Sequence, residues 1–403
     1  MSQRHVLIAN VHFAPFSYGG ATIVAEEIAH ALMRRGGYVV SVVSTCVRPD
    51  LAPYGVVRAE KAGITNYLIN LPEHRSYAER YDNPAVTARL AELVSALHPD
   101  LIHAHCLQDI GTGIFPAAEA AGIPVVLSVH DFWWLCERQF MVRIDQTYCG
   151  QSPVQVEACK GCAENYWAAK MRFDHMRDLA SRAARVTYPS NFAKDLHERS
   201  GFAPGKGVVW ENGVHLPEAG FFEDQKARQD GDATVTFGYL GGPSQIKGWP
   251  LIRDAFATLG RDDFRVLLVE GSLDGSWWKG QNFADLMGDW RVVPRFSQLE
   301  LDRFYAQIDV LLFPSQWKET YGLALREALA RGLPVIQTDS GGTVEHDAVV
   351  EQDLIPIGPY PQLLCQQIEK RLDQGQVRNN PVPVQSFAAQ ADAFHVLVEQ
   401  IIG

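Results

Sequence analysis

The sequence alternates short apolar runs with segments of helical periodicity, and it does so in two separate series. The apolar runs of the first series lie at 5–9, 38–43, 101–105, 125–129 and 186–189. Those of the second series lie at 234–240, 264–270, 310–313 and 354–357. Repeated strand–helix alternation predicts parallel sheets with helices on both faces. The predicted fold is therefore α/β, with two doubly wound Rossmann-like domains facing each other across a cleft.

The chain has 403 residues, which is more than one ordinary hydrophobic core takes up. Glycines and polar residues between 201 and 231 separate the two series. We therefore expect a first domain over 1–210, a second over 211–383, and a final helical segment over 384–403.

Overall charge and composition exclude several classes of protein. A net charge of −11 argues against broad nucleic-acid binding. No apolar run reaches the length of a transmembrane helix, and seven unevenly spaced cysteines fit a reducing cytosol. We expect a cytoplasmic protein. Eight Lys or Arg against four Asp or Glu between 165 and 206 could steer an anionic acceptor or bring the chain to the inner membrane face, although such runs are usually solvated helix surfaces.

Two glutamates lie eight residues apart in the stretch FPSQWKETYGLALREALARGLPVIQTDSGG, at Glu319 and Glu327. A fully helical connection would separate them by about 12 Å, which is the span from a nucleotide's ribose to a sugar on its diphosphate. Gly322, at the expected helix start, leaves room for a ligand at the backbone N–H groups. The alternative is a surface helix with two acidic residues.

Loops that follow the expected strands carry further candidates. Ligands of doubly wound sheets bind at such loops. Gly19 and Gly20 precede the first helix, Lys247 lies in a glycine-rich loop, and His130 ends a buried strand. The alternative for the two glycines is a plain turn. For Lys247 it is a solvated lysine, and for His130 a histidine that merely ends its strand. His103 and His105 share one face and could ligate a metal, but no third ligand has the usual spacing.

Four of the seven cysteines fall within 27 residues, in a polar segment over about 132–165: Cys136, Cys149, Cys159 and Cys162. Four thiolates suffice for a structural zinc; an iron–sulfur cluster fits their spacing less well, and plain thiols or a disulfide are the alternative. The aromatic residues near this segment could stack on acceptor sugars or contact a membrane, or belong to the core. They are Phe132, Trp133, Trp134 and Trp167.

Together these motifs resemble the retaining family-4 glycosyltransferases of GT-B fold, over nearly the whole chain. The stretch around Glu319 and Glu327 resembles that family's pair of glutamates with seven residues between them. The resemblance implies that Glu319 contacts donor-sugar hydroxyls, helped by the backbone of Tyr321, Gly322 and Leu323. It implies that Glu327 contacts the nucleotide's ribose.

The loops match the family as well. The resemblance places Gly19 and Gly20 near the diphosphate and the acceptor, His130 near the sugar and Lys247 at the phosphates. Gly242 stands where the family usually has a phosphate-binding arginine, and Arg295 is a candidate to replace it.

The implied activity is retaining transfer of a sugar from a UDP-, GDP- or ADP-sugar to a glycan, lipid-linked or other hydroxyl acceptor, in polysaccharide or glycoconjugate biosynthesis. His130, Glu319 and Lys247 are the expected catalytic residues. No metal-binding Asp-x-Asp motif follows a strand, so no catalytic metal is expected. The segment 384–403 resembles a helix that returns to the first domain, and the cysteine segment resembles an insertion found in a subset of the family. The alternatives are a non-catalytic nucleotide-sugar-binding subunit, favoured by Gly242, and a GT-B epimerase.

Overall fold

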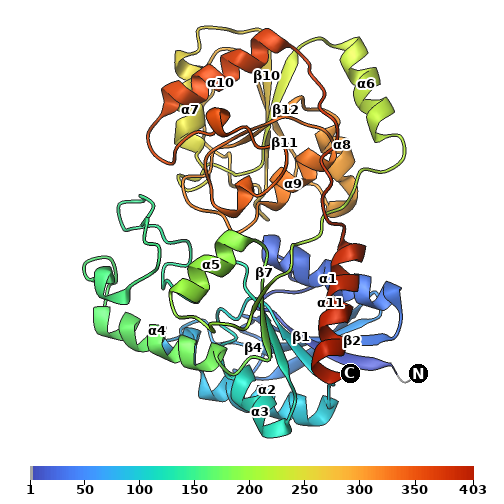
Figure 1. Ribbon diagram of the computed structural model, residues 1–403, viewed down its shortest axis with the longest axis vertical. Coiled ribbons are helices and arrows are strands. Elements are labelled where there is room, and N and C mark those ends of the chain that lie inside the picture. The colour runs from blue at the N-terminus through green and yellow to red at the C-terminus, as the bar shows by residue number, and fades with distance from the viewer. Residues whose placement is uncertain (1–2) are drawn as a thin grey trace. The chain divides into compact units, whose positions relative to one another are not determined.

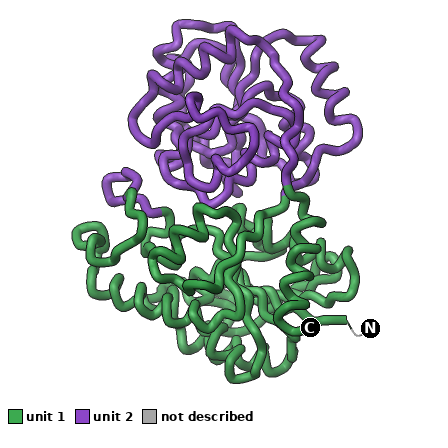
Figure 2. The backbone as a smooth tube through the Cα atoms, viewed as in Figure 1, with its two compact units in different colours: residues 1–140, 150–213, 385–403 green, residues 141–149, 214–384 purple. Residues whose placement is uncertain are grey.

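The computed structural model describes residues 3–403, which form two compact units. Unit 1 comprises Met1–Phe140, Gly150–Gly213 and Gln385–Gly403, and unit 2 comprises Met141–Cys149 and Val214–Val384 (Figure 2). The chain thus enters unit 2 twice before its last helix completes unit 1.

Unit 1 is built on an eight-stranded sheet with the order β3-β4-β2-β1-β5-β6-β7-β8. Strands β1, β2, β4 and β7 of this sheet are labelled in Figure 1. All neighbouring strands are parallel except β3 and β4, which form an antiparallel pair at one edge. The strands are β1 (Arg4–Ala9), β2 (Tyr38–Cys46), β3 (Val56–Lys61), β4 (Ile64–Asn70), β5 (Leu101–Ala104), β6 (Val125–Ser128), β7 (Arg185–Tyr188) and β8 (Gly207–Val209).

Helices connect these strands, as parallel pairing requires. They are α1 (Gly20–Arg35), α2 (Pro84–Leu97), α3 (Ile114–Ala121), α4 (Tyr166–Ala180) and α5 (Asn191–Arg199). Helix α11 (Phe387–Ile402) is added to the unit from the end of the chain. Asn83 and Ser190 each accept hydrogen bonds from the first backbone N–H groups of α2 and α5, and so fix where these helices begin. The last helix, α11, packs against α1, which brings the two ends of the chain's sequence into one unit.

Unit 2 contains a five-stranded parallel sheet with the order β11-β10-β9-β12-β13. Its strands are β9 (Val235–Tyr239), β10 (Phe264–Val269), β11 (Asp289–Val293), β12 (Val310–Phe313) and β13 (Val335–Gln337). Its helices are α6 (Phe221–Gly231), α7 (Trp249–Thr258), α8 (Leu301–Tyr305), α9 (Leu323–Ala330) and α10 (Pro361–Gln374). Short 3-10 turns complete the described chain at Ala78–Arg80, Val156–Cys159, Gln298–Glu300, Gly342–Val344 and Glu351–Asp353.

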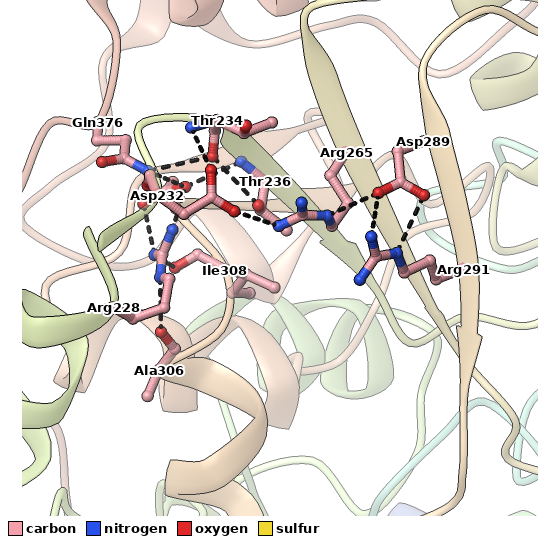
Figure 3. A network of polar contacts seen from close by, with 11 residues as sticks. Arg228, Asp232, Thr234, Thr236, Arg265, Asp289, Arg291, Ala306, Ile308 and Gln376 are labelled. Carbon is pink, nitrogen blue, oxygen red and sulfur yellow. Dashed lines mark hydrogen bonds and ion pairs between the residues drawn. The ribbon is translucent and has the colours of Figure 1, made fainter. Parts of the chain in front are cut away.

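Ion pairs join the amino ends of the strands of unit 2. Arg265 at the start of β10 lies between Asp232 and Asp289, with nitrogen–oxygen distances of 2.9 Å to each (Figure 3). Asp309, directly before β12, is almost fully buried and accepts hydrogen bonds from both terminal nitrogens of Arg228 at 2.9 and 2.7 Å. A carboxylate this deeply buried requires such a partner. These contacts stabilise the edge of the sheet opposite to the loops that bind ligands in doubly wound folds.

The predicted α/β architecture of two doubly wound domains is confirmed. The expected strand at 354–357 is wrong, because this segment forms a single bridge between Ile355 and Thr338 rather than a strand. The antiparallel pair β3–β4 escaped the sequence interpretation, because polar and charged residues interrupt the short apolar runs of both strands. Helix α6 escaped it too, because its eleven residues are mostly polar.

The segment 132–165 contains only one short helical turn among loops, Val156–Cys159. We expected the whole segment in the first domain, whereas Met141–Cys149 belongs to unit 2. Phe132, Trp133 and Trp134 are buried, so their role is core packing rather than contact with an acceptor or a membrane. Trp167 is 70% exposed. None of the helices in residues 3–403 is long and apolar enough to cross a membrane.

Candidate functional site

The loops after β9 and β12 bring Lys247 and Glu319 together. These strands are neighbours and parallel, so their following loops emerge at the same edge of the sheet. The Gln316 backbone N–H donates to the Ile246 carbonyl at 2.8 Å and joins the two loops. Gly248 permits this approach, because a Cβ atom there would lie 2.0 Å from the Pro314 carbonyl oxygen. The close contact explains why a glycine follows the lysine.

The Lys247 ammonium donates to Glu319 Oε1 at 2.7 Å. The Ser315 hydroxyl donates to the same oxygen at 2.7 Å, and the Glu319 side chain is 9% exposed. Lys247 also lies 5.3 Å from the centre of the Trp317 ring, in cation–π geometry. The pair is thus a partly exposed cation held by a buried carboxylate. Ser315 and Trp317 were not identified from the sequence, although both lie within four residues of Glu319.

Glu319 is fixed by its backbone as well as its side chain. Its N–H donates to the Ser340 carbonyl at 3.1 Å, and its own carbonyl accepts from Gly342 at 2.9 Å. This parallel bridge connects the loop to the segment after β13, where the sequence has its Gly-Gly pair. The connection between the two glutamates is therefore not fully helical: Glu319 lies in a loop, and α9 begins only at Leu323.

Helix α9 begins directly after Gly322, the glycine expected at its start. Gly322 has φ +83°, a conformation that glycine adopts at little cost. A Cβ atom at this position would lie only 3.0 Å from the Thr343 methyl group. Tyr321, just before it, is buried beneath the Arg326 guanidinium, which lies 4.9 Å from the ring centre. The first N–H groups of a helix have no intrahelical partner and favour negative charge. The start of α9 is thus suited to an anion.

Glu327 lies on α9 with a different set of partners. The Tyr305 hydroxyl donates to its Oε2 atom at 2.9 Å, and the Arg331 guanidinium binds its backbone carbonyl at 3.0 Å. Burial raises the pKa of Glu327 above its usual value, against the opposing effects of the Tyr305 hydrogen bond and the nearby Arg331 and His215. Tyr305 was not identified from the sequence, since it lies 22 residues upstream in an ordinary helical pattern.

Gly242 is a glycine for a structural reason. It has φ +66°, and a Cβ atom there would lie 2.6 Å from the Trp277 ring. The Glu270 carboxylate accepts hydrogen bonds from the N–H groups of Ser272 and Trp278, which folds the loop that carries Trp277. The indole thus occupies the space into which a side chain at 242 would extend. Arg295 is exposed and follows β11, a strand that lies about 10 Å from β9 at the usual strand spacing, with β10 between them.

The residues predicted from the first series belong to unit 1. Gly19 has φ +83° with open space where its side chain would be, and α1 begins at Gly20. His130 follows β6 and is partly exposed. Its Nε2 atom lies 2.9 Å from Nδ1 of His105, and burial lowers the pKa of His130 to about 4. His130 is therefore a neutral imidazole at neutral pH.

Three of the four cysteines in the insertion line a small cavity of about 30 Å³: Cys136, Cys159 and Cys162. Cys149 belongs to the segment of unit 2. Within residues 3–403, no three His, Cys, Asp or Glu side chains are grouped so that they could hold a metal ion. A bound zinc stays a prediction, which metal analysis of the purified protein would decide.

Comparison with known proteins places both units in one class of enzyme. The model of Glycosyltransferase Family 4 matches residues 18–217, and the model of Glycosyl transferases group 1 matches residues 234–374. A protein in the cps region of Klebsiella pneumoniae, described as an uncharacterized 42.6 kDa protein, is 21% identical over 85% of this chain and 87% of its own.

Solved structures share the fold. Sucrose-phosphate synthase from Thermosynechococcus elongatus aligns with a TM-score of 0.65 at 16% identity, covering 100% of this chain and 95% of its own. HepE from Anabaena in complex with UDP aligns with a TM-score of 0.62 at 18% identity, covering 99% and 96%. Both units thus have the GT-B architecture, and the two family matches extend over most of the chain. The chain is a glycosyltransferase, with a Family 4 region in its first half and a group 1 region in its second.

Proposed function

We propose that the protein is a retaining glycosyltransferase that moves a sugar from a UDP-sugar to a hydroxyl of a growing polysaccharide or glycoconjugate. The observation that carries the proposal is the Lys247–Glu319 pair, held at the carboxyl ends of β9 and β12 next to the start of α9. A cation, a helix N-terminus and a buried carboxylate are the groups that a diphosphate and a sugar hydroxyl need.

Each residue has a distinct part in this proposal. Lys247 and the first N–H groups of α9 stabilise the charge that develops on the leaving diphosphate. Glu319 accepts a hydrogen bond from a donor-sugar hydroxyl, and Glu327 accepts one from the ribose. Arg295 supplies the charge missing at Gly242. The leaving phosphate takes the acceptor proton on the same face, which requires no separate base.

The relatives support the donor and the pathway. The Anabaena HepE structures hold UDP, UDP-glucose and glucose, so a UDP-sugar is the donor we propose. The relative from a cps region supports a role in polysaccharide synthesis. A basic stretch around the exposed Trp167 would serve to approach a lipid-linked acceptor at a membrane surface.

Thermal unfolding with UDP-, GDP- and ADP-sugars tests the donor, because a ligand specific for the folded state raises its stability by mass action. We expect a shift with UDP-sugars alone. Failure of all three to shift unfolding would contradict the proposal. Binding with neither transfer nor hydrolysis of the donor would instead identify a non-catalytic binding subunit, the alternative favoured by Gly242.

A further inference from the structure

A row of hydrogen-bonded side chains crosses the sheet of unit 1 and ends at His130. His130 Nε2 lies 2.9 Å from His105 Nδ1, and His105 Nε2 lies 3.2 Å from His103 Nδ1. His103 Nε2 lies 2.7 Å from the Ser128 hydroxyl, which lies 2.6 Å from the Thr187 hydroxyl. These residues lie on the neighbouring strands β5, β6 and β7 or within two residues of their ends. The row therefore leads from a partly exposed histidine into the core.

Every inner member of the row is buried. His103, His105, Ser128 and Thr187 are each at most 2% exposed. His103 is stacked on Phe394 of α11 with ring centres 4.3 Å apart, and His105 is stacked on His130 at 5.1 Å. Burial lowers the pKa of both inner histidines well below the usual value, so both are neutral at neutral pH. Each neutral ring has one N–H and one lone pair, hence the hydrogen bonds must all run in the same sense.

The hydroxyl end of the row decides that sense. If Thr187 donates to Ser128, then Ser128 donates to His103, and each following Nδ1–H donates to the next Nε2. In the opposite sense Ser128 donates to Thr187, whose own hydrogen then needs another acceptor. Among residues 3–403, the Thr187 side chain has Ser128 as its sole hydrogen-bonding partner. An unsatisfied buried donor disfavours that arrangement by about tenfold or more.

We propose that this row holds His130 in its Nδ1–H form, with His103, His105 and Ser128 as positioning residues. His130 then has a proton at Nδ1 and a lone pair at Nε2 that is already used by His105. It has no lone pair left to accept a proton from a substrate. In the sugar transfer proposed above, His130 would therefore not act as a general base.

The tautomers are measured directly by two-dimensional ¹⁵N–¹H NMR of the full chain with ¹⁵N-labelled histidine, without any substrate. Single variants His130→Ala, His105→Ala and His103→Ala assign the three rings. We expect protonated Nδ1 and unprotonated Nε2 in all three. Protonated Nε2 in His130, or rapid exchange between the two forms, would overturn the proposal whether or not the protein transfers sugars.

Two variants that differ only in the Ser128 oxygen atom test whether the Ser128 hydroxyl sets the His130 tautomer. Thr187→Val keeps the Ser128 donor, so the His130 tautomer should not change. Ser128→Ala together with Thr187→Val removes the donor, and a mixture of the two His130 tautomers should appear. The turnover of the double variant should fall by about twofold relative to Thr187→Val, because about half of its molecules then hold the other tautomer. An unchanged His130 tautomer in the double variant would show that the hydroxyls do not set it.

Discussion

Replacing Lys247 with methionine tests the site through stability and binding at once. Lys247→Met removes the 2.7 Å ion pair but keeps a long side chain against the Trp317 ring. Glu319, 9% exposed, would still accept a hydrogen bond from the Ser315 hydroxyl. A fully exposed pair contributes at most about 1 kcal/mol, whereas breaking a fully buried one costs about 3–5 kcal/mol.

The pair lies between these limits, because the lysine side chain is 35% exposed. We therefore expect the free protein to lose about 2 kcal/mol of unfolding free energy. For a unit of this size, that lowers the unfolding temperature by about 4–8 °C. Differential scanning calorimetry with and without UDP-sugar measures both effects.

The change in unfolding temperature produced by UDP-sugar shows whether Lys247 contacts the ligand or only stabilises the fold. If Lys247 binds the diphosphate, the shift produced by UDP-sugar should disappear in Lys247→Met. Glu319→Gln serves as the control, since it also breaks the ion pair but leaves the cation for the diphosphate. An equal UDP-sugar shift in Lys247→Met and in the unaltered protein would refute the role assigned to Lys247.

Three further predictions concern unit 2. Glu327→Ala should weaken binding of free UDP by about tenfold, as measured by calorimetry, whereas Glu319→Ala should mainly lower turnover; equal effects on UDP affinity would contradict the two roles. Because burial raises the pKa of Glu327, the folded state binds its proton more tightly than the unfolded chain does, and this group's contribution to stability falls as pH rises above 4.5. Glu327→Gln should therefore stabilise the protein at pH 8 more than at pH 4.5 in urea unfolding, and a constant difference would contradict this. Asp309→Ala should cost about 3–5 kcal/mol in the same assay, because it leaves Arg228 without its carboxylate, while the half-exposed Asp289→Ala should cost at most about 1 kcal/mol; similar losses would contradict the burial argument.

The sequence was most informative where a motif and a periodic pattern coincide. Lys247, Glu319 and Gly322 follow strands whose apolar runs are unambiguous, so the rule for loops at carboxyl ends was enough to select them. This rule could not identify Tyr305 as the partner of Glu327 or Trp277 as the neighbour of Gly242, because these contacts depend on how a separate helix and a separate loop pack against the site.

His103 on β5 and His105 directly after it show the same limit. Their alternation predicted that His103 and His105 share a face, and a metal was the chemistry considered. The structure instead directs their ring nitrogens at one another, at Ser128 and at His130. Which strand lies beside β5 could not be read from the spacing of the two histidines, and it is the neighbouring strand β6 that makes the row.

The proposed function is tested most directly by following an α-linked UDP-sugar with the purified enzyme by time-resolved ¹H NMR. The donor used is the one that raises the unfolding temperature, and both transfer and slow hydrolysis report the anomeric configuration of the product. We predict that the α-anomer appears first and that Glu319→Ala slows its formation. First appearance of the β-anomer, or no turnover of any bound UDP-sugar, would contradict retaining transfer at this site.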